Sequence, residues 1–272
     1  MSTKVFISGI QGFIGSHLKT ECESRGFLVY GTTRADSADD TDRLLESTRP
    51  NYIFHAAAEL LDDTKMFGTN ISLTQTILEF CKRNIAAGFL ERLVVFGSSS
   101  EYGRKLGPMS EHYVLEPETI YEGTKAAATL LTRSYSITYK IPTIVIRPFT
   151  VYGPGEKSRK LIQILLTLPK KVRISEGVHD YVYIGDFIDI VFDILYTCNK
   201  LFDIVNIGTG KQTTNLEVLR LVEKLTGHEF AVESVPGKPY DSQSWVCDTT
   251  YLQYIYRCKA STSLEDGLKF MI

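Results

Sequence analysis

A glycine-spaced turn near the N-terminus constrains the fold more than any other feature of this 272-residue sequence. Residues 4–8 have the composition of a short β-strand, and residues 13–24 carry apolar side chains at helical spacing. The segment GIQGFIG joins them, with a glycine at positions 9, 12 and 15. These glycines allow a tight turn, a close approach of the backbone to a pyrophosphate, and close packing of helix on strand, respectively. The turn therefore predicts a dinucleotide site at the helix N-terminus, lined by Gly9, Gly12, Phe13, Ile14 and Gly15.

Strand-like and helix-like segments alternate through the first half of the chain. The strand-like runs are apolar along their whole length and cover residues 4–8, 27–30, 52–55, 93–96 and 143–146. The helical runs between them cover residues 13–24, 39–48, 70–83 and 121–139. Apolar strands that alternate with helices are typical of a parallel sheet covered on both faces. We therefore expect an α/β fold with a doubly wound parallel sheet.

The alternation loosens after the Gly-Pro-Gly step at residues 153–155. Helical patterns then cover residues 161–168, 187–196 and 216–225, with a terminal helix from Ser263, and strand-like runs cover residues 180–184 and 204–207. No disordered linker separates the two halves. We therefore expect a first domain over residues 1–152 and a smaller C-terminal lobe over residues 153–272, with some of the chain crossing back to the first domain.

The composition excludes several other classes of protein. The chain is 43% hydrophobic and 23% charged with a formal net charge of −2, close to the globular average, so fibrous and disordered chains are excluded. The near-neutral charge predicts no nucleic-acid partner, and the lack of a long apolar run predicts no membrane span. Five scattered cysteines without a CxxC pair, and no signal-peptide pattern, indicate a reduced cytoplasmic protein. No histidines occur at metal-ligand spacing, so we expect no metal.

The end of the second strand bears on the choice of nicotinamide cofactor. NAD enzymes usually carry Asp or Glu there to bind the ribose 2′-hydroxyl, whereas an arginine accommodates the 2′-phosphate of NADP. Here the strand is followed by Thr32, Thr33 and Arg34, and the first carboxylate is Asp36. Arg34 and the threonine hydroxyls suit a phosphate, although an arginine in a solvated loop would give the same sequence. The pattern favours NADP(H) and leaves NAD(H) open.

A serine, a tyrosine and a lysine follow two later elements of the expected sheet. The strand at 93–96 is followed by Gly97 and Ser98, and Tyr121 and Lys125 begin the long helix four residues apart, on one face. The lysine is expected to lower the tyrosine pKa, and the serine hydroxyl can bind the same substrate oxygen. Together these groups can exchange a proton with a carbinol or carbonyl oxygen while a nicotinamide carries the hydride.

Further motifs follow in an order that spans nearly the whole chain. They are HAAA at 55–58, Asn70, GSSSEYG at 97–103, YEGTK at 121–125, RPFTVYGPG at 147–155, DYVYIGD at 180–186, NIGTG at 206–210 and TSLEDGLK at 262–269. With the glycine turn, this series resembles extended short-chain dehydrogenases/reductases of the NAD-dependent epimerase/dehydratase family, which act on nucleotide sugars. The resemblance implies a Rossmann-type NAD(P)-binding domain, a smaller substrate-binding lobe, a nucleotide-sugar partner and a homodimer formed through the helices at 70–83 and 121–139.

The resemblance also implies roles for individual residues. Tyr121 would be the acid/base, and Lys125 would hold the ribose and tune Tyr121. Ser98 would be the hydroxyl partner because it lies four residues before Tyr102, with Ser99 as the fallback. Other residues implied at the cofactor are Ala56, Ala57 and Pro148.

The chain departs from the family pattern on the adenine side. Residues 35–51 leave little room for the strand that the family usually has there, together with its acidic residue at the adenine. We expect this strand to be missing or vestigial, and Asp36 either takes the acidic role or is a solvated loop residue. The segment before Asn70 is short as well.

Further departures fall on the substrate side. His179 stands where the family often has an arginine that meets the substrate diphosphate, and Thr150 stands in place of the usual asparagine. Positive charge from Arg159 and its neighbouring lysines would replace the arginine, or else forms a solvated helix start. The residues expected on the substrate side are Ser99, Thr150, His179 and Arg159.

Three functions follow from these expectations. The first is an NADPH-dependent oxidoreductase, a 4-reductase for a nucleotide-linked 4-keto-6-deoxyhexose in deoxysugar biosynthesis, since Ser100 stands where sugar dehydratases carry an acid. The second is a nucleotide-sugar epimerase with retained NAD, for which the same side chains suffice. The third is a non-catalytic dinucleotide-binding regulatory subunit, which would not need Ser98, Tyr121 and Lys125 together.

Overall fold

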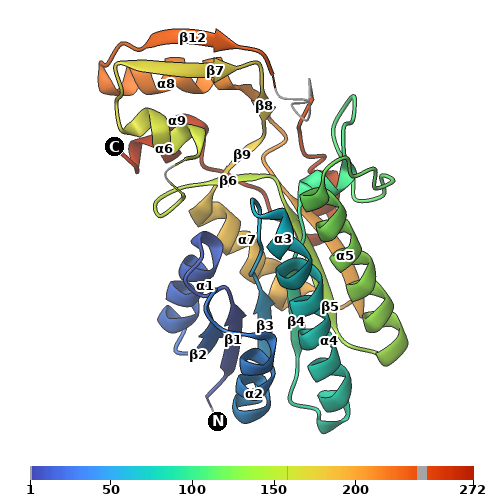
Figure 1. Ribbon diagram of the computed structural model, residues 1–272. Helices are drawn as coiled ribbons and strands as arrows, with labels where there is room; N and C mark the ends of the chain where they lie inside the picture. The colour runs from blue at the N-terminus through green and yellow to red at the C-terminus, as the bar shows by residue number, and fades with distance from the viewer. Residues whose placement is uncertain (1, 158, 238–243) are drawn as a thin grey trace. The chain divides into compact units, whose positions relative to one another are not determined.

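The computed structural model describes residues 2–157, 159–237 and 244–272, which form two compact units (Figure 1). Unit 1 comprises Met1–Gly103, Leu115–Arg147 and Val191–Val205, and unit 2 comprises Arg104–Val114, Pro148–Ile190 and Asn206–Ile272. Each unit is built from stretches far apart in the sequence. The division into a cofactor domain and a substrate lobe at residues 152 and 153 stays a prediction.

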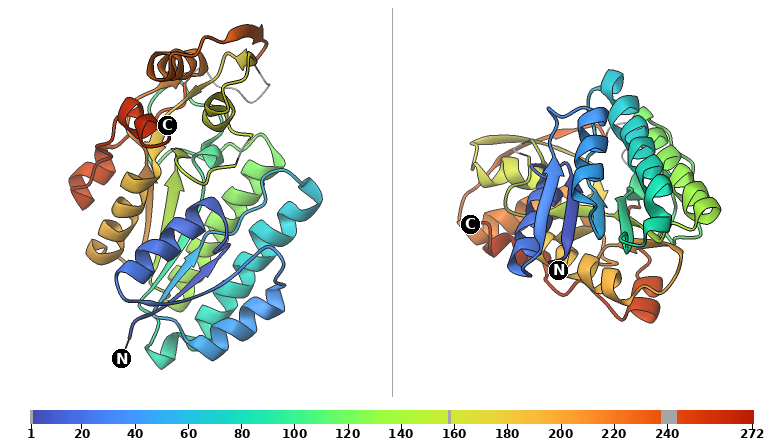
Figure 2. Two further views of the ribbon diagram at one scale, coloured as in Figure 1. Left: turned by 90° about the vertical axis from the view of Figure 1, so that its left-hand side faces the viewer. Right: turned by 90° about the horizontal axis from the view of Figure 1, so that it is seen from below.

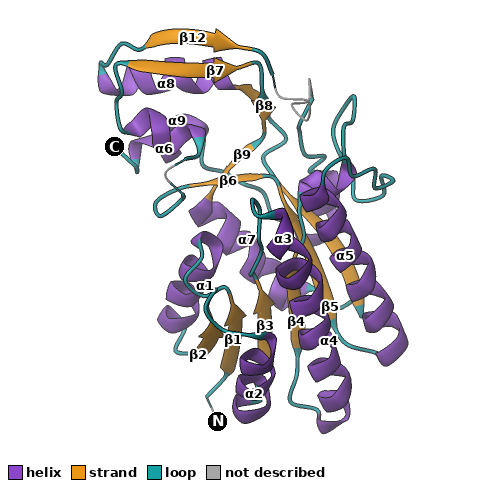
Figure 3. Cartoon of the chain, viewed as in Figure 1, coloured by secondary structure: helices purple, strands orange, loops and turns teal. Residues whose placement is uncertain are grey.

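A six-stranded sheet forms the centre of unit 1, with the strand order β10-β5-β4-β3-β1-β2. Figure 3 shows β2, β1, β3, β4 and β5 side by side in this order. The pairings from β2 through β1, β3 and β4 to β5 are all parallel. The strands are β1 Lys4–Ser8, β2 Leu28–Thr32, β3 Tyr52–His55, β4 Arg92–Phe96, β5 Thr143–Pro148 and β10 Phe202–Ile207. The predicted class is therefore confirmed, because this is a mostly parallel Rossmann-type sheet with helices on both faces.

Helices cover both faces of this sheet (Figure 2). Ile53 of β3 faces a buried apolar cluster with α2, α4 and α5, whereas the next residue, Phe54, contacts Phe192 of α7 on the other face. Arg25, at the end of α1, lies over the same Phe192 ring, so α1 and α7 share that face. The helices of this unit are α1 Phe13–Ser24, α2 Ala38–Thr48, α3 Asp63–Met66, α4 Leu73–Asn84, α5 Ile120–Tyr139 and α7 Ile184–Thr197, which continues into unit 2.

The sheet ends at β2, as expected from the short segment that follows this strand. Only α2 lies between Thr32 and Tyr52, and a capping box at Ser37 starts that helix. Residues 35–51, all of them described, therefore contain no strand beside β2. The prediction that the usual strand is missing is confirmed.

The described residues of unit 2 form short paired strands, three short or medium α-helices and a π-helical turn, Leu252–Tyr256. β6 Thr150–Tyr152 pairs with β9 Tyr181–Tyr183 and β7 Lys171–Ser175 with β12 Ala231–Val235, both parallel, while β8 Val178–His179 and β11 Thr213–Thr214 are antiparallel. The helices that lie wholly in the unit are α6 Leu161–Leu166, α8 Asn215–Thr226 and α9 Leu264–Lys269. The strand expected over 180–184 is shorter, because its last residue already begins α7.

Two carboxylates of the DYVYIGD motif, the buried Asp180 and the half-buried Asp186, organise unit 2. Asp180 accepts the N–H and hydroxyl of Thr209 and the N–H of Gly210, so it joins its motif to NIGTG. Asp186 accepts the N–H and hydroxyl of Thr262 and so holds the start of TSLEDGLK. These motifs therefore have a structural role in unit 2, independent of any ligand.

Two expectations from the composition can be compared with the structure directly. Among the described residues, no helix is both long and apolar enough to cross a bilayer. All five cysteines are described and buried, and no disulfide joins any two of them.

Candidate active site

The glycine turn has the geometry that a phosphate site requires. α1 begins at Phe13, and its N-cap residue Gly12 provides no side-chain cap. The backbone N–H groups of the first turn and the positive end of the helix dipole can therefore bind an anion. Gly9 has φ +71°, and a Cβ on Gly15 would lie 2.1 Å from the Gly9 carbonyl oxygen. Side chains at these positions would fill the turn, so the turn fits a dinucleotide pyrophosphate.

Gly15→Ala is expected to weaken NAD binding by about tenfold or more, because the added methyl group overlaps the Gly9 carbonyl and forces the turn apart. Calorimetric titration of the purified variant with NAD measures this. Gly68→Ala is the matched control, since a Cβ there has no heavy atom within 4 Å. Unchanged affinity in Gly15→Ala would show that the cofactor does not bind at this turn.

The end of β3 lies against the glycine turn. The N–H groups of Ala56 and Ala57 donate to the carbonyl and the hydroxyl of Ser8, the residue before the turn. Both alanines thus lie beside the turn, where the sequence places them. His55 is buried, with its ring nitrogens 2.6 Å from Ser8 Oγ and 2.8 Å from Thr74 Oγ1, and burial lowers its pKa to about 3. It is a satisfied core residue.

Arg34, after β2, already has an anionic partner. Its Nη2 lies 3.1 Å from Oε2 of Glu59, whose side chain is 6% exposed against 74% for Arg34. The same carboxylate accepts the N–H groups of Leu60 and Leu61. Burial alone would raise the pKa of Glu59, but the N–H bonds from Leu61 and Asp62 and the charge of Arg34 together lower it. The carboxylate is therefore ionised and competes with any phosphate for Arg34.

Asp36 is held within its own turn and is exposed. Its carboxylate accepts the backbone N–H of Thr33 at 2.7 Å and the Thr33 hydroxyl at 2.8 Å.

The sequence did not predict a role for Glu59. The sequence does not distinguish Glu59, because it is one of three carboxylates within residues 59–63 and its partner Arg34 is far away in the chain.

The three candidate catalytic side chains meet within unit 1. Ser98 follows β4, while Tyr121 and Lys125 lie in the first two turns of α5. The Ser98 side chain lies close enough to Tyr121 to lower the tyrosine pKa, and Ser98 Oγ lies 2.7 Å from Ser100 Oγ. The structure thus brings together the residues that the sequence selects, and the serine that acts on the tyrosine is Ser98, which favours it over Ser99.

The expected effect of Lys125 on the tyrosine is corrected by the structure. Burial raises the pKa of Tyr121 to about 12, and the hydrogen bond from Ser98 offsets this only in part. Lys125 Nζ donates to the carbonyl of Phe96, and burial lowers the pKa of Lys125 to about 8. The lysine is thus bound to the end of β4, and burial has the largest effect on the pKa of both Tyr121 and Lys125. At neutral pH Tyr121 carries its proton.

Three candidate substrate residues, Thr150, Arg159 and His179, lie in unit 2, as does Pro148, whereas the fourth, Ser99, lies in unit 1. Thr150 Oγ1 lies 3.4 Å from His179 Nδ1, and the His179 ring meets Tyr181 edge to face. Arg159 is exposed in the turn before α6, next to a residue outside the described part of the chain. The structure therefore brings Thr150 and His179 together. No contact between Arg159 and either residue is found among the described residues.

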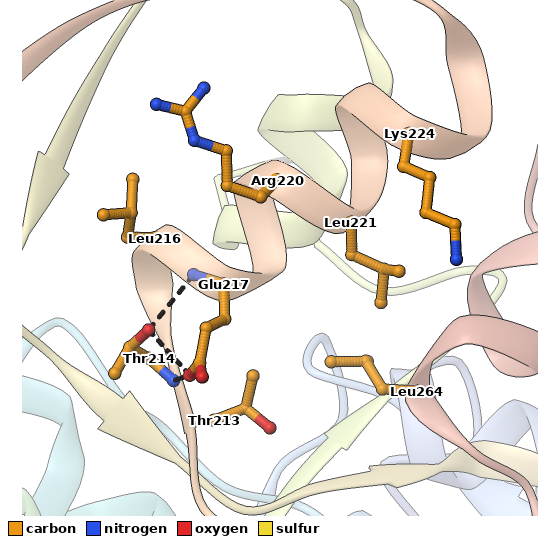
Figure 4. Close-up of a pocket in the computed structure, with 8 residues that line it drawn as sticks. All are labelled: Thr213, Thr214, Leu216, Glu217, Arg220, Leu221, Lys224 and Leu264. Carbon is orange, nitrogen blue, oxygen red and sulfur yellow. Dashed lines mark hydrogen bonds between the residues drawn. The ribbon is translucent and has the colours of Figure 1, made fainter.

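A surface hollow elsewhere in unit 2 contains none of the predicted site residues (Figure 4). Its polar groups already have structural partners: Thr214 and Glu217 cap α8, and Lys224 pairs with Glu265. The hollow is lined by Thr213, Thr214, Leu216, Glu217, Arg220, Leu221, Lys224 and Leu264. In the part of the chain that the structure describes, no three His, Cys, Asp or Glu side chains could hold a metal ion.

The parallel sheet and the glycine turn define a Rossmann-type α/β protein of the dinucleotide-binding kind. Residues 5–208 match the model of the NAD dependent epimerase/dehydratase family, and the chain belongs to this family. The resemblance seen in the motifs is thereby confirmed.

Known relatives cover nearly the whole chain. The uncharacterized UDP-glucose epimerase YtcB of Bacillus subtilis (strain 168) is 29% identical over 97% of this chain and 95% of its own length. A trifunctional UDP-glucose 4,6-dehydratase/UDP-4-keto-6-deoxy-D-glucose 3,5-epimerase/UDP-4-keto-L-rhamnose-reductase of Arabidopsis thaliana, RHM3, is 29% identical over 93% of this chain, which spans 40% of that protein. Among solved structures, MoeE5 in complex with UDP-glucose and NAD has a TM-score of 0.89 and 26% identity, covering 98% of this chain and 96% of MoeE5.

Proposed function

We propose that this chain is a nucleotide-sugar epimerase that retains NAD and inverts a carbinol centre of a nucleoside-diphosphate hexose. The observation that carries the proposal is the convergence of Ser98, Tyr121 and buried Lys125 at the carboxyl end of β4, where Lys125 donates to the Phe96 carbonyl and Ser98 acts on the pKa of Tyr121. Family membership supports an oxidoreductase site, and relatives with high coverage include a protein named as an epimerase and one bound to UDP-glucose and NAD. UDP-hexoses are therefore the substrates of first choice.

Each half of the proposed reaction needs proton transfer at one oxygen. Bound NAD would accept a hydride from the carbinol carbon and return it to the opposite face of the ketone. Tyr121 Oη takes up the hydroxyl proton in the oxidising half and donates it in the reducing half. Ser98 holds the substrate oxygen. The Ser98 hydroxyl also contacts the Ser100 hydroxyl, so Ser100 is a second hydrogen-bond partner for Ser98. The protonated form of Tyr121 at neutral pH is the form required for donation in the reducing half. The oxidising half needs the phenolate, so Tyr121 has to release its own proton to solvent before it takes up the carbinol proton.

The cofactor would be NAD because Glu59 neutralises the arginine that would otherwise bind a 2′-phosphate. Arg34 lies at the position that selects the ribose 2′ group in this fold. A phosphate placed there would meet the ionised Glu59 carboxylate, a like charge, at the same guanidinium. This reverses the preference for NADP drawn from Arg34 alone.

Glu59→Gln is expected to raise the affinity for NADPH by about tenfold, with less than a twofold change for NADH, since the amide removes one like-charge contact and frees Arg34. Fluorescence titration with both nucleotides measures the ratio. Asp62→Asn is the control, because it removes a carboxylate from the same segment that pairs with Lys65. Equal changes for both nucleotides would contradict a role of Glu59 in cofactor choice.

An NADPH-dependent 4-reductase of deoxysugar biosynthesis is the second candidate. It is favoured by the protonated state of Tyr121, which suits ketone reduction in one direction. Ser100, where dehydratases carry an acid, argues against a dehydratase and is compatible with both candidates.

The proposal is tested by turnover without added cofactor. Purified protein is incubated with UDP-glucose and UDP-glucuronic acid, and the products are followed by proton NMR, while the nucleotide released on denaturation is identified. An epimer product and co-purified NAD support the proposal. Turnover only of keto-sugars, with stoichiometric loss of NADPH, would replace it with the reductase.

The homodimer implied by the resemblance belongs to this proposal as well. The exposed side of α5 carries Leu130, Ile137 and Tyr139, which would be buried by a second copy. Sedimentation velocity of wild type and Leu130→Glu would show a dimer that the variant loses, and a monomeric wild type would exclude it.

A further inference from the structure

A buried ion pair supports the Ser98 turn from within unit 1. Glu101 is fully buried, and its Oε2 lies 2.9 Å from Nε of Arg147, which is 2% exposed. Arg147 also donates to the hydroxyl of Tyr102 at 2.9 Å and lies over the Tyr102 ring. Burying two charges costs so much desolvation energy that such a pair seldom adds net stability, so stability alone does not account for it.

One oxygen of this carboxylate joins the two segments that carry the candidate catalytic residues. Glu101 Oε1 accepts the backbone N–H of Ser98 at 2.8 Å and the hydroxyl of Thr129 at 2.9 Å. Thr129 lies on α5 four residues after Lys125 and eight after Tyr121, so the three side chains share one face of the helix. The link therefore fixes how that face of α5 is turned relative to the serine.

The surroundings are adapted to the carboxylate. A Cβ on Gly97 would lie 2.5 Å from Glu101 Oε1, so glycine at this position leaves the space that the carboxylate occupies. The charge of the carboxylate also acts on the pKa values of Tyr121 and Lys125 on that face of α5. Burial has the largest effect on the pKa of both Tyr121 and Lys125, and the negative charge of Glu101 raises both.

We infer that Glu101 is a positioning residue for proton transfer: its buried carboxylate holds the Ser98 hydroxyl in register with the candidate catalytic face of α5. A carboxylate is required because one oxygen binds Ser98 and Thr129 while the other binds Arg147, and an amide offers a single acceptor oxygen. The effect on turnover rests on the proposed function, whereas the geometric link does not depend on a substrate.

Thr129→Val tests the link while leaving the Glu101–Arg147 pair intact. It removes the hydroxyl that bonds to Glu101 and keeps the shape of the side chain. The matched control is Thr132→Val, because Thr132 is equally buried on α5 and its hydroxyl bonds only to the Ala128 carbonyl, within the helix. Thr129→Ser restores the hydroxyl and serves as the rescue variant.

The expected result is a fall in kcat of about tenfold for Thr129→Val with less than a twofold change in KM, since a small misplacement of reacting groups acts on turnover. Amide hydrogen exchange of the peptide 97–103 rises in the same variant. Thr132→Val and Thr129→Ser stay near the wild type in both measurements. The exchange measurement needs no substrate.

Two results would overturn the inference. One is unchanged kcat and exchange in Thr129→Val. The other is an equal loss of kcat in Thr132→Val, which would show that the effect comes from the general stability of α5 and not from the link to Glu101. A wild-type protein that turns over no nucleotide sugar would instead refute the proposed function, and exchange that rises only in Thr129→Val would then still support the positioning link.

Discussion

Tyr121→Phe is expected to lower kcat by about 10³-fold, within the range that a positioned general acid/base contributes. The substitution removes only the hydroxyl that exchanges the proton and whose pKa the Ser98 side chain lowers. The ring keeps its packing, so NAD affinity should change by less than about threefold. Steady-state kinetics at saturating substrate, together with NAD titration of the same preparation, measure both quantities.

The control for this variant lies on the same helix. Tyr135→Phe removes a hydroxyl that bonds to Glu79, about four turns further along α5, and should leave kcat near the wild-type value. If Tyr121→Phe retained the full biological activity of the chain, the site would not be catalytic. The non-catalytic regulatory subunit would then become the better description.

Arg147→Met is expected to destabilise the protein by about 3–5 kcal/mol, because it leaves the carboxylate of Glu101 buried without its counter-ion. The substituted side chain fills a similar volume, so the loss comes from charge rather than from a cavity. Urea unfolding followed by circular dichroism measures it. Arg83→Met is the control, since Arg83 pairs with Asp42 and Glu46 at the surface, where such pairs contribute about 1 kcal/mol or less.

The destabilisation should depend on pH in a defined direction. Burial raises the pKa of Glu101 above its ordinary value, and the charge of Arg147 is the strongest influence that opposes this rise. Without Arg147 the pKa rises further, so the folded variant binds a proton that the unfolded chain releases. The loss of unfolding free energy in the variant is therefore largest above the Glu101 pKa of the folded variant, and it becomes smaller as the pH falls through that pKa. An equal deficit at pH 8 and pH 5.5 would contradict the charge explanation.

The sheet of unit 1 was predictable because parallel strands are buried on both faces and read as continuous apolar runs. The strands at Lys4–Ser8 and Tyr52–His55 are found with their predicted bounds. The helix expected from Asn70 begins differently: a π-helical stretch, Phe67–Ser72, precedes α4 and breaks the 3.6-residue period on which the prediction rests. The two- to five-residue strands of unit 2 carry too few residues to show any period.

The site was predictable where its residues sit at fixed short spacings. Tyr121 and Lys125 are one helical turn apart, and the family resemblance selects Ser98 by its distance from Tyr102. The structure brings these three candidate residues together, and their roles stay a prediction. Glu59 and Glu101 were not found as functional candidates, because their roles come from partners distant in the chain. The pKa of Tyr121 was misjudged for the same reason, since burial is a property of the whole fold.

The most direct test of the proposed epimerase is the fate of the hydrogen on the carbon that is inverted. A nucleotide sugar deuterated at that carbinol carbon is incubated with the NAD-loaded protein in the presence of unlabelled NADPH, and the product is examined by mass spectrometry. A retained hydride that returns to the same carbon predicts an epimer with its full deuterium content and no consumption of NADPH. A product that has lost its deuterium, with NADPH consumed in equal amount, would contradict the account.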